Sequence, residues 1–286
     1  MKICLSGPSG SGKTYSALQL ARGFSDSWEN ICLIDTEQGS ASLYSNLGPF
    51  KVINLEAPFH PKRYNEAIQL AVEAGMSVVV IDSISHEWSG KGGCLEIHEQ
   101  TMQRMKIPNS FAAWGSVTPL HQDFLDTITR AKVHVICTAR SKTEYVLVDR
   151  NGKQTPQKVG MAPITRDGFE FEMSIHFELD QTHQAFCSKD RTGLFMDKDP
   201  FRITEDTGRR ILQWCTGSGG EDVAVLIQAC DTVKGLLELH GCLSEEQQRE
   251  FLPLFRHRKA ELLLMNNSTQ VLSKQPTSRN GYLDLR

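Results

Sequence analysis

The residues best suited to chemistry lie near the start of the chain, in a glycine-rich segment. Residues 7–14 read Gly-Pro-Ser-Gly-Ser-Gly-Lys-Thr and match the pattern G-x-x-x-x-G-K-[ST] in full. In such a loop, backbone N–H groups point at phosphate oxygens, the Lys reaches the β- and γ-phosphates, and the Thr hydroxyl ligates Mg²⁺. The sequence therefore predicts a site for Mg²⁺–ATP. The expected nucleotide-binding residues are Gly7, Pro8, Ser9, Gly10, Ser11, Gly12, Lys13, Thr14 and Tyr15.

Two acidic residues follow apolar runs that could end beside this loop. The run at 78–81 ends at Asp82, where a carboxylate can hold Mg²⁺ together with Thr14. The run at 31–34 leads to Glu37, which could orient and deprotonate the water that attacks a γ-phosphate. Lys13 and Glu37 are therefore the catalytic candidates. The alternatives are a loop-capping role for Asp82 and a solvated surface position for Glu37.

The elements that must position these residues alternate between apolar runs and helical patterns. Strands are expected at 3–6, 31–35, 52–55, 78–82 and 133–138, and helices at 13–24, 61–74, 95–105 and 119–131. Strands that are apolar throughout, separated by helices, predict a mostly parallel sheet with helices on both faces. The fold class is therefore α/β.

The pattern changes after residue 140. The runs at 144–148 and 154–159 flank Asn151-Gly152, a strong hairpin signal. Residues 169–180 alternate strictly between apolar and polar, which predicts one long strand covered on one face, paired with 185–189. These are expected as antiparallel strands appended to the parallel sheet, followed by a helix that Thr204 caps and that ends near Cys215.

The C-terminal part reads as a separate small unit. We expect a core at 1–216, a Gly/Ser linker at 217–221, a helical module at 222–265 and a disordered polar tail at 266–286. Helices are expected at 222–239 and 244–264, with Ser244 and Gln247 as a capping box and Pro253 as a kink or stop.

Composition limits the classes of protein to consider. Of 286 residues, 31 are Lys or Arg and 34 are Asp or Glu, so a nucleic-acid site would have to be a local patch. The chain has no long apolar run and no recognisable leader, so a cytoplasmic protein without a membrane association is expected. The 8 cysteines contain no C-x-x-C pair and are expected to be reduced core thiols rather than disulfides or zinc ligands.

Two segments could bind a single strand of nucleic acid, which needs a basic track and stacking aromatic side chains. Segment 85–117 carries Lys91, Arg104 and Lys106 with Trp88, Phe111 and Trp114. Segment 140–168 carries Arg140, Lys142, Arg150, Lys153, Lys158 and Arg166, with Tyr145 as its aromatic residue. The alternative is a solvated hairpin and tryptophans packed in a core.

The glycine-rich loop, Asp82 and Glu37 together resemble the RecA-like branch of P-loop ATPases, in which the catalytic Glu follows the second strand. Segment 189–193, Lys-Asp-Arg-Thr-Gly, resembles the K-x-R motif of RadA, KaiC and the replicative helicases. In those families the Lys and Arg reach the γ-phosphate of the neighbouring subunit. The resemblance thus implies that Lys189 and Arg191 act in a ring or filament as further catalytic residues.

Three further segments are similar to phage-encoded RecA-like ATPases of the single-strand annealing and recombination group. They are Asp-Ser-Ile-Ser-His-Glu-Trp at 82–88, Thr-Ala-Arg-Ser-Lys at 138–142 and Arg-Asp-Gly-Phe-Glu-Phe-Glu at 166–172. The resemblance covers about residues 1–216, and the remainder resembles a small helical module of some phage recombination proteins. Unlike RecA, the sequence shows no N-terminal helical domain and no Gln after 133–138, a place that Arg140 or Lys142 would take.

The resemblance implies a RecA-like Mg²⁺–ATP-dependent ATPase that acts on single-stranded DNA in recombination or strand annealing. Its implied partners are single-stranded DNA, further copies of the chain, and a single-strand-binding or other recombination protein. One alternative is a KaiC-like oligomer switched by nucleotide without DNA coupling. A P-loop kinase is a weaker alternative, because the sequence shows no Arg-rich lid.

Overall fold

The computed structural model describes residues 1–150, 153–217, 223–243 and 245–272. The chain separates into two compact units, Met1–Thr216 and Gly217–Arg286, and each is described by itself.

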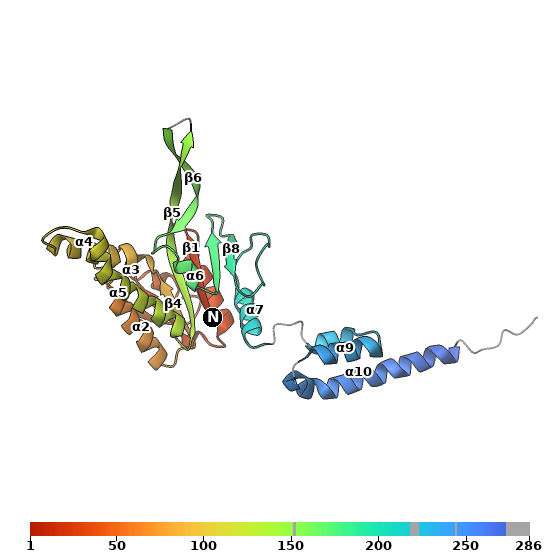
Figure 1. Cartoon of the computed structure of the whole chain (residues 1–286). Helices are drawn as coiled ribbons and strands as arrows, with labels where there is room; N and C mark the ends of the chain where they lie inside the picture. Colours follow the sequence, from red (N-terminus) through yellow and green to blue (C-terminus); the bar gives the residue numbers. More distant parts are fainter. Residues whose placement is uncertain (151–152, 218–222, 244, 273–286) are drawn as a thin grey trace, which may run out of the picture. The chain divides into compact units, whose positions relative to one another are not determined.

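Among the described residues of the first unit, eight strands form one sheet in the order β3-β2-β4-β5-β1-β7-β8, and β6 pairs with β5 (Figure 1). The strands are β1 (Lys2–Gly7), β2 (Ile31–Asp35), β3 (Lys51–Asn54), β4 (Val78–Asp82), β5 (His134–Arg150), β6 (Lys153–Pro163), β7 (Ile175–Leu179) and β8 (Ala185–Asp190). The pairs from β3 to β7 are parallel, whereas β8 runs antiparallel to β7 and β6 antiparallel to β5. The predicted fold class, a mostly parallel α/β sheet with appended antiparallel strands, is confirmed.

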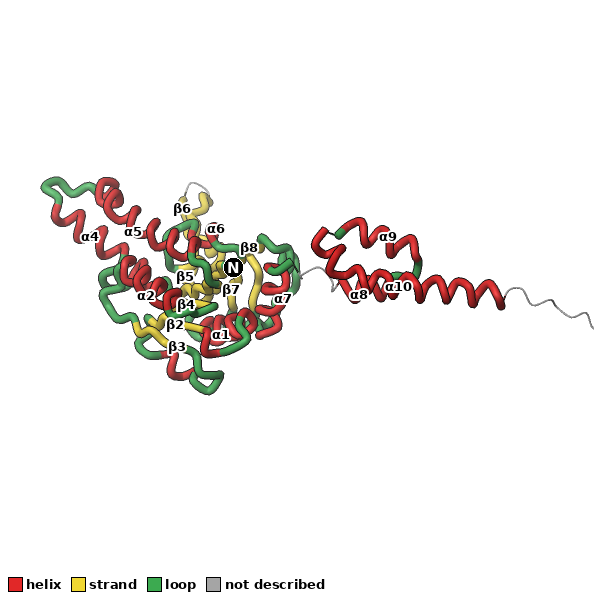
Figure 2. The backbone as a smooth tube through the Cα atoms, turned by 90° about the horizontal axis from the view of Figure 1, so that it is seen from below, coloured by secondary structure: helices red, strands yellow, loops and turns green. Residues whose placement is uncertain are grey.

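Helices cover both faces of the sheet (Figure 2). α1 (Lys13–Phe24) and α7 (Glu205–Cys215) contribute to one core layer, and α2 (Pro61–Glu73) and α5 (Ser110–Arg130) to the other. Strand β4 shows why its run is apolar throughout, because Val78 and Val80 enter the first layer and Val79 and Ile81 the second. The shorter helices are η1 (Trp28–Asn30), η2 (Ser40–Tyr44), α3 (Ser85–Ser89), α4 (Cys94–Arg104) and α6 (Phe169–Glu172).

The contact between α1 and α7 depends on two glycines. A Cβ on Gly23 would lie 2.2 Å from the carbonyl oxygen of Glu205 and 2.6 Å from the Cα of Gly208. A Cβ on Gly208 would lie 2.4 Å from the carbonyl oxygen of Leu20. The two helix backbones thus approach so closely that no other residue fits without separating them.

The hairpin prediction is confirmed, with Arg150 opposite Lys153, while the turn residues 151–152 lie outside the described residues. The expectation of separate strands at 133–138 and 144–148 is wrong, because β5 runs unbroken from the sheet into the hairpin. Figure 1 shows this β5–β6 arm extending beyond the sheet edge. The arm begins where the strand passes the end of β1, since Gly7 still pairs with Arg140.

The long strand predicted at 169–180 is also wrong in its first third. Gly168, with φ 90°, starts the short helix α6, and the strand begins only at Ile175. Phe169 and Met173 are both buried, so the alternating pattern also contained the four-residue spacing of a helix. Nor is β7 covered on one face only, since Ile175, His176 and Phe177 are all buried. Its predicted pairing with 185–189 is confirmed.

The second unit holds three described helices: α8 (Val223–Ala229), α9 (Val233–Cys242) and α10 (Glu245–Leu272). They pack around Ile227, Leu236, Phe255 and Leu262. The single helix expected at 222–239 is divided, because the Thr232 side chain accepts a hydrogen bond from Gly235 N and starts a new helix.

Helix α10 continues through Pro253 and runs to Leu272, past the expected end of the module at 265. Residues 218–222 of the expected linker, Ser244 of the expected capping box, and residues 273–286 of the expected tail lie outside the described part of the chain. Within the part that is described, no helix is long and apolar enough to cross a membrane.

Candidate functional site

The glycine-rich loop joins β1 to α1 at the carboxyl edge of the sheet. Gly12 has φ 84°, a left-handed conformation, and a Cβ there would lie 3.1 Å from Nδ1 of His183. Lys13 Nζ curls back and donates to the carbonyl oxygen of Pro8 at 2.8 Å. The Ser11 hydroxyl is buried and has no hydrogen-bond partner among the described residues. The Lys13 ammonium and the Ser11 hydroxyl of the loop therefore remain available to donate hydrogen bonds to a ligand.

A cavity of about 360 Å³ opens beside this loop. It is lined by Ser9, Gly10, Gly12, Lys13, Thr14, Glu37, Ser40, Tyr44, Asp82, Arg140 and His183. Of the remaining residues predicted to bind nucleotide, Pro8 holds Lys13 through its carbonyl, whereas Tyr15 is exposed on α1 and does not line the cavity. Gly7 accommodates Ser11, since a Cβ there would lie 2.6 Å from Ser11 Oγ.

Thr14 and Asp82 meet at the cavity, as the prediction of a metal site requires. Thr14 Oγ1 donates to Asp82 Oδ2 at 2.6 Å, and the Thr138 hydroxyl donates to the other carboxylate oxygen. Burial raises the pKa of Asp82 above its ordinary value, although both hydroxyl donors act in the opposite direction. A hydroxyl and a carboxylate are the hard oxygen ligands that Mg²⁺ prefers.

The donors present therefore fit a Mg²⁺–nucleotide. Lys13 and the loop N–H groups would hold the phosphates, and Thr14 with Asp82 would hold the ion, which supplies positive charge at the phosphate oxygens. Burial lowers the pKa of Lys13, an effect that the nearby carboxylates of Asp82 and Glu37 oppose.

Glu37 is half-buried at the cavity and forms an ion pair with Arg140. Arg140 Nε donates to Oε1 at 2.9 Å and Nη2 donates to Oε2, while Ser83 Oγ donates to Oε1 at 3.3 Å. Burial would raise the pKa of Glu37, but the hydrogen bonds and charge of Arg140 outweigh it, so the pKa lies below its ordinary value. Glu37 is therefore a carboxylate at neutral pH.

The loop that carries Glu37 is braced from two sides. Asp35 at the end of β2 accepts hydrogen bonds from Glu37 N at 2.7 Å and Ala41 N at 2.8 Å. The Thr36 hydroxyl accepts from Ser83 N at 2.8 Å and contacts His86 Nδ1 at 2.8 Å. The segments that follow β2 and β4 are thereby joined, which keeps Glu37 next to Asp82.

Sequence reasoning missed several residues of this site, among them Ser40 and Tyr44 of the cavity lining, Thr138, Ser83 and His183. Thr138 has a recognisable signal, because it lies two residues before Arg140 on the same side of β5. Ser83 follows Asp82 directly, so its position beside the site follows once β4 is known to end at Asp82. His183 comes from the turn after β7, and no sequence spacing links that turn to the glycine-rich loop.

Lys189 and Arg191 converge on one acceptor in their own chain. Lys189 Nζ donates to the carbonyl oxygens of Phe171 and, at 3.2 Å, Glu170, while Arg191 Nη2 donates to the Phe171 carbonyl at 3.0 Å. Both acceptors belong to α6. Neither cation lines the cavity of its own chain.

The basic residues predicted to bind nucleic acid do not share one environment. Arg140 lies at the cavity with Glu37, and Arg166 lies over the ring of Trp114, 5.9 Å from its centroid. Lys142 is exposed at the base of the β5–β6 arm. Arg150, Lys153 and Lys158 belong to the two strands of that arm, and their side chains lie outside what the structure describes.

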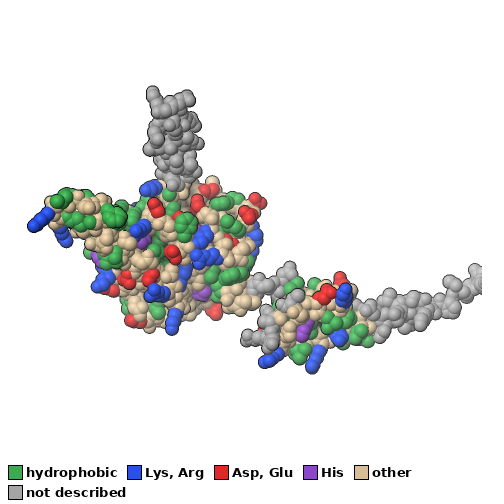
Figure 3. Space-filling model, in the orientation of Figure 1, with side chains coloured by type: hydrophobic (Ala, Val, Ile, Leu, Met, Phe, Trp, Pro, Cys, Tyr) green, Lys and Arg blue, Asp and Glu red, His purple; other side chains and the backbone are tan. Residues whose placement is uncertain are grey.

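The aromatic residues of segment 85–117 divide in the same way. Trp88 and Trp114 stack on each other with ring centroids 5.6 Å apart, so they pack within the protein. Phe111 is 91% exposed and Ile107 is 82% exposed, beside the exposed side chains of Arg104 and Lys106. Figure 3 shows hydrophobic and basic side chains together at this projecting end of α4 and α5.

Comparison with known proteins gives a family for this arrangement. No curated protein matches. A solved KaiC-like protein, PH0186 from the hyperthermophilic archaeon Pyrococcus horikoshii OT3, is similar with a TM-score of 0.41 and 16% identity, over 72% of this chain and 87% of that one. The family model described as AAA domain, AAA_24, matches residues 1–213, which include the whole cavity. The chain therefore belongs to the AAA_24 family of AAA-domain P-loop ATPases.

Proposed function

We propose that this chain is a Mg²⁺–ATP-dependent ATPase that acts on single-stranded DNA in recombination or strand annealing. The observation that supports hydrolysis is the meeting of Lys13, Thr14, Asp82 and Glu37 at one cavity. Lys13 and Thr14 follow β1, Asp82 is the last residue of β4, and Glu37 follows β2. Parallel strands bring their carboxyl ends to one edge of the sheet. These residues supply phosphate binding, metal ligands and a carboxylate for water.

In this proposal Glu37 orients the attacking water and accepts its proton, a role for which a carboxylate with a low pKa is already in the correct form. Arg140 holds Glu37 in place and contributes positive charge to the same cavity, where it would contact the γ-phosphate. Lys13 stabilises the charge that develops on the transferred phosphate.

The proposal assigns Lys189 and Arg191 to the site of a neighbouring copy. Within their own chain both cations are bonded to the α6 carbonyls and lie outside the cavity lining. Only hydrogen bonds to the carbonyl oxygens of the single-turn helix α6 would have to break. A γ-phosphate is a stronger acceptor for two cations than a carbonyl oxygen, so the exchange is favourable. Assembly as a ring or filament would thus complete each site.

Two surfaces of the first unit support the DNA part of the proposal. The β5–β6 arm belongs to the basic segment 140–168, and its strand β5 begins in the sheet and passes Arg140 at the nucleotide cavity. A ligand bound to the arm would therefore contact the strand, β5, that also carries Arg140 at the nucleotide cavity. The exposed Phe111 with Arg104 and Lys106 offers a second surface of the kind that binds single strands.

The experiment is steady-state Mg²⁺–ATP hydrolysis by the full chain, with and without single-stranded DNA. We expect DNA to stimulate hydrolysis, and Lys13→Ala and Glu37→Gln each to lower kcat roughly 100-fold or more. Glu37→Gln keeps the phosphate-binding loop, so it should still bind ATP, whereas Lys13→Ala should bind it weakly. A rate that DNA leaves unchanged would remove the DNA-coupled part. A Glu37→Gln rate equal to the wild-type rate would remove its assigned role.

A nucleotide-switched oligomer without DNA coupling is the second candidate, favoured by the Glu37–Arg140 ion pair. While that pair persists, the carboxylate is occupied by a guanidinium, and a slow basal turnover follows. Nucleotide-dependent assembly in the absence of DNA, measured by light scattering, would favour this candidate. Transfer of phosphate to an acceptor other than water would instead favour a kinase.

A further inference from the structure

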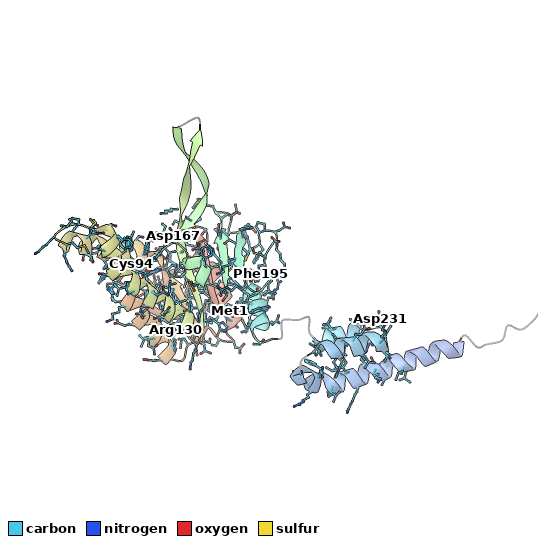
Figure 4. All side chains as sticks on the ribbon, in the orientation of Figure 1. Met1, Cys94, Arg130, Asp167, Phe195 and Asp231 are labelled. Atoms are coloured by element: carbon cyan, nitrogen blue, oxygen red, sulfur yellow. The ribbon has the colours of Figure 1, made fainter. Side chains whose placement is uncertain are left out.

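Three side chains of types that can ligate a metal meet in the core where α3, α4 and α5 come together, in a group that the proposed ATP hydrolysis does not use. They are Glu87 of α3, Cys94 at the start of α4 and His121 of α5 (Cys94 is labelled in Figure 4). Their exposed fractions are 0%, 0% and 2%. One ligand atom from each lies within 4.8 Å of the other two.

Their contacts are short and mutual. Glu87 Oε1 lies 3.1 Å from His121 Nδ1 and 3.1 Å from Cys94 Sγ, and Oε2 lies 3.2 Å from His121 Nδ1. Neither Lys nor Arg pairs with the Glu87 carboxylate in the described part of the chain. Nε2 of His121 is buried and has no hydrogen-bond partner there. The buried Glu87 carboxylate therefore has only two side-chain partners among the described residues, the His121 imidazole and the weakly donating Cys94 thiol.

We infer that Glu87, Cys94 and His121 form a binding site for a zinc-class divalent ion, separate from the Mg²⁺ site at Thr14 and Asp82. A thiolate, an imidazole and a carboxylate are the three ligand types that Zn²⁺ takes in proteins. A Cys thiolate and a Glu carboxylate with a neutral His carry two negative charges, which balance the charge of the ion in a buried site. Mg²⁺ does not fit, because it prefers oxygen ligands and avoids sulfur.

The spacing of the ligand atoms agrees with such an ion. Bonds of about 2.0–2.3 Å at tetrahedral angles place the ligand atoms roughly 3.3–3.7 Å apart. The observed 3.1 Å contacts of the Glu87 oxygen are slightly shorter, so those two contacts need to lengthen by only a few tenths of an ångström, and Cys94 Sγ lies within 4.8 Å of the His121 ligand nitrogen. Gly92 and Gly93 precede Cys94 and form the link from α3, and Gly92 N donates to Glu96 Oε2, which holds the start of α4 in position.

A bound ion would fix the position of α3 relative to the nucleotide site. Helix α3 starts three residues after Asp82, and its His86 contacts Thr36 in the loop that carries Glu37. Tying Glu87 to α4 and α5 would therefore stabilise the contact between the segments that follow β2 and β4. We assign the ion a structural role because all three ligands are buried and none lines the nucleotide cavity. The described residues supply three ligands, so a fourth, such as one water molecule, would complete the tetrahedron.

The test is binding of Co²⁺, a spectroscopic substitute for Zn²⁺, to the chelator-treated full chain without nucleotide. We expect stoichiometric binding, with d–d bands of a tetrahedral site and a thiolate-to-Co²⁺ charge-transfer band in the near ultraviolet. Cys94→Ala should lose the charge-transfer band and bind roughly 100-fold more weakly or worse. Cys32→Ala, which removes another buried thiol, should keep both. Asp82→Asn should also keep both, because that carboxylate belongs to the other site.

Added Zn²⁺ should raise the Tm of the wild type and of Cys32→Ala but leave that of Cys94→Ala unchanged, which gives a readout that does not depend on spectra. His121→Gln should lose the Tm shift as Cys94→Ala does. Absence of stoichiometric Co²⁺ binding by the wild type would overturn the inference. Spectra from Cys94→Ala with an intact charge-transfer band, or a Tm shift shared by all variants, would overturn it too.

Discussion

The Glu37–Arg140 ion pair makes a sharp prediction about proton transfer in the proposed reaction. Arg140→Gln removes the guanidinium whose Nε donates to Glu37 Oε1 at 2.9 Å and whose Nη2 donates to Oε2. The burial of Glu37 then raises its pKa unopposed by this partner. Because only the carboxylate can accept a proton from water, the acid limb of kcat/KM should move to higher pH.

The size of the shift follows from the exposure of the two side chains. Glu37 is 24% exposed and Arg140 is 44% exposed, so water screens the pair. We therefore assign it about 1 kcal/mol, near the upper end for exposed ion pairs. One pH unit corresponds to about 1.4 kcal/mol, so the acid limb should rise by roughly 0.7 pH unit. The wild-type pKa lies below its ordinary value, so wild-type kcat/KM should stay level down to about pH 5.

The assay is steady-state hydrolysis at saturating Mg²⁺, with kcat/KM measured from about pH 8 down to about pH 3.5, so that the acid limbs of the wild type and the variant both lie in the measured range. The position of the limb carries the test, since Arg140→Gln also removes positive charge from the cavity and lowers the plateau. Lys142→Gln removes an exposed positive charge two residues away and should leave the limb in place. The reasoning is refuted if the Arg140→Gln limb does not move, or if Lys142→Gln moves it equally.

Three further predictions address packing, pH dependence and assembly. Gly23→Ala should lower the free energy of unfolding, measured in urea, by about 1–3 kcal/mol, because its Cβ meets the α7 backbone. Gly115→Ala, which has open space around it, should raise the free energy of unfolding by about 0.5–1 kcal/mol. Equal effects of the two substitutions would contradict the close contact between α1 and α7. Burial, followed by the charge of a nearby lysine, lowers the pKa of His176 to about 4. Because the pKa of a His in the unfolded chain is about 6.5, the stability gained from a neutral, buried His176 is fully present above that pH, and the free energy of unfolding should fall by about 2 kcal/mol between there and pH 5. If His176→Gln loses stability equally steeply over this range, the titration of His176 is not the cause. Finally, Arg191→Ala and Lys13→Ala should each hydrolyse ATP poorly but regain activity when mixed, because each supplies the group that the other lacks; mixtures without recovery would show that Arg191 does not act between copies.

The sequence predicted those parts of the site that depend on local pattern. The glycine-rich loop needs only its own residues and the helix that follows, and Asp82 and Glu37 needed only a buried strand before each. Strand and helix types were predicted where the apolar period was unambiguous. The pattern misled at 169–180, because a spacing of four residues satisfies both a helix and an alternating strand.

What the sequence could not specify are the contacts between segments distant along the chain. The order β3-β2-β4-β5-β1 brings Thr138 to Asp82 and Arg140 to Glu37, and the turn after β7 brings His183 to Gly12. The group of Glu87, Cys94 and His121 likewise exists only where three helices meet. Local spacing determines which way a side chain points along its own element. The partner it meets depends on strand order and helix packing, which the tertiary structure alone decides.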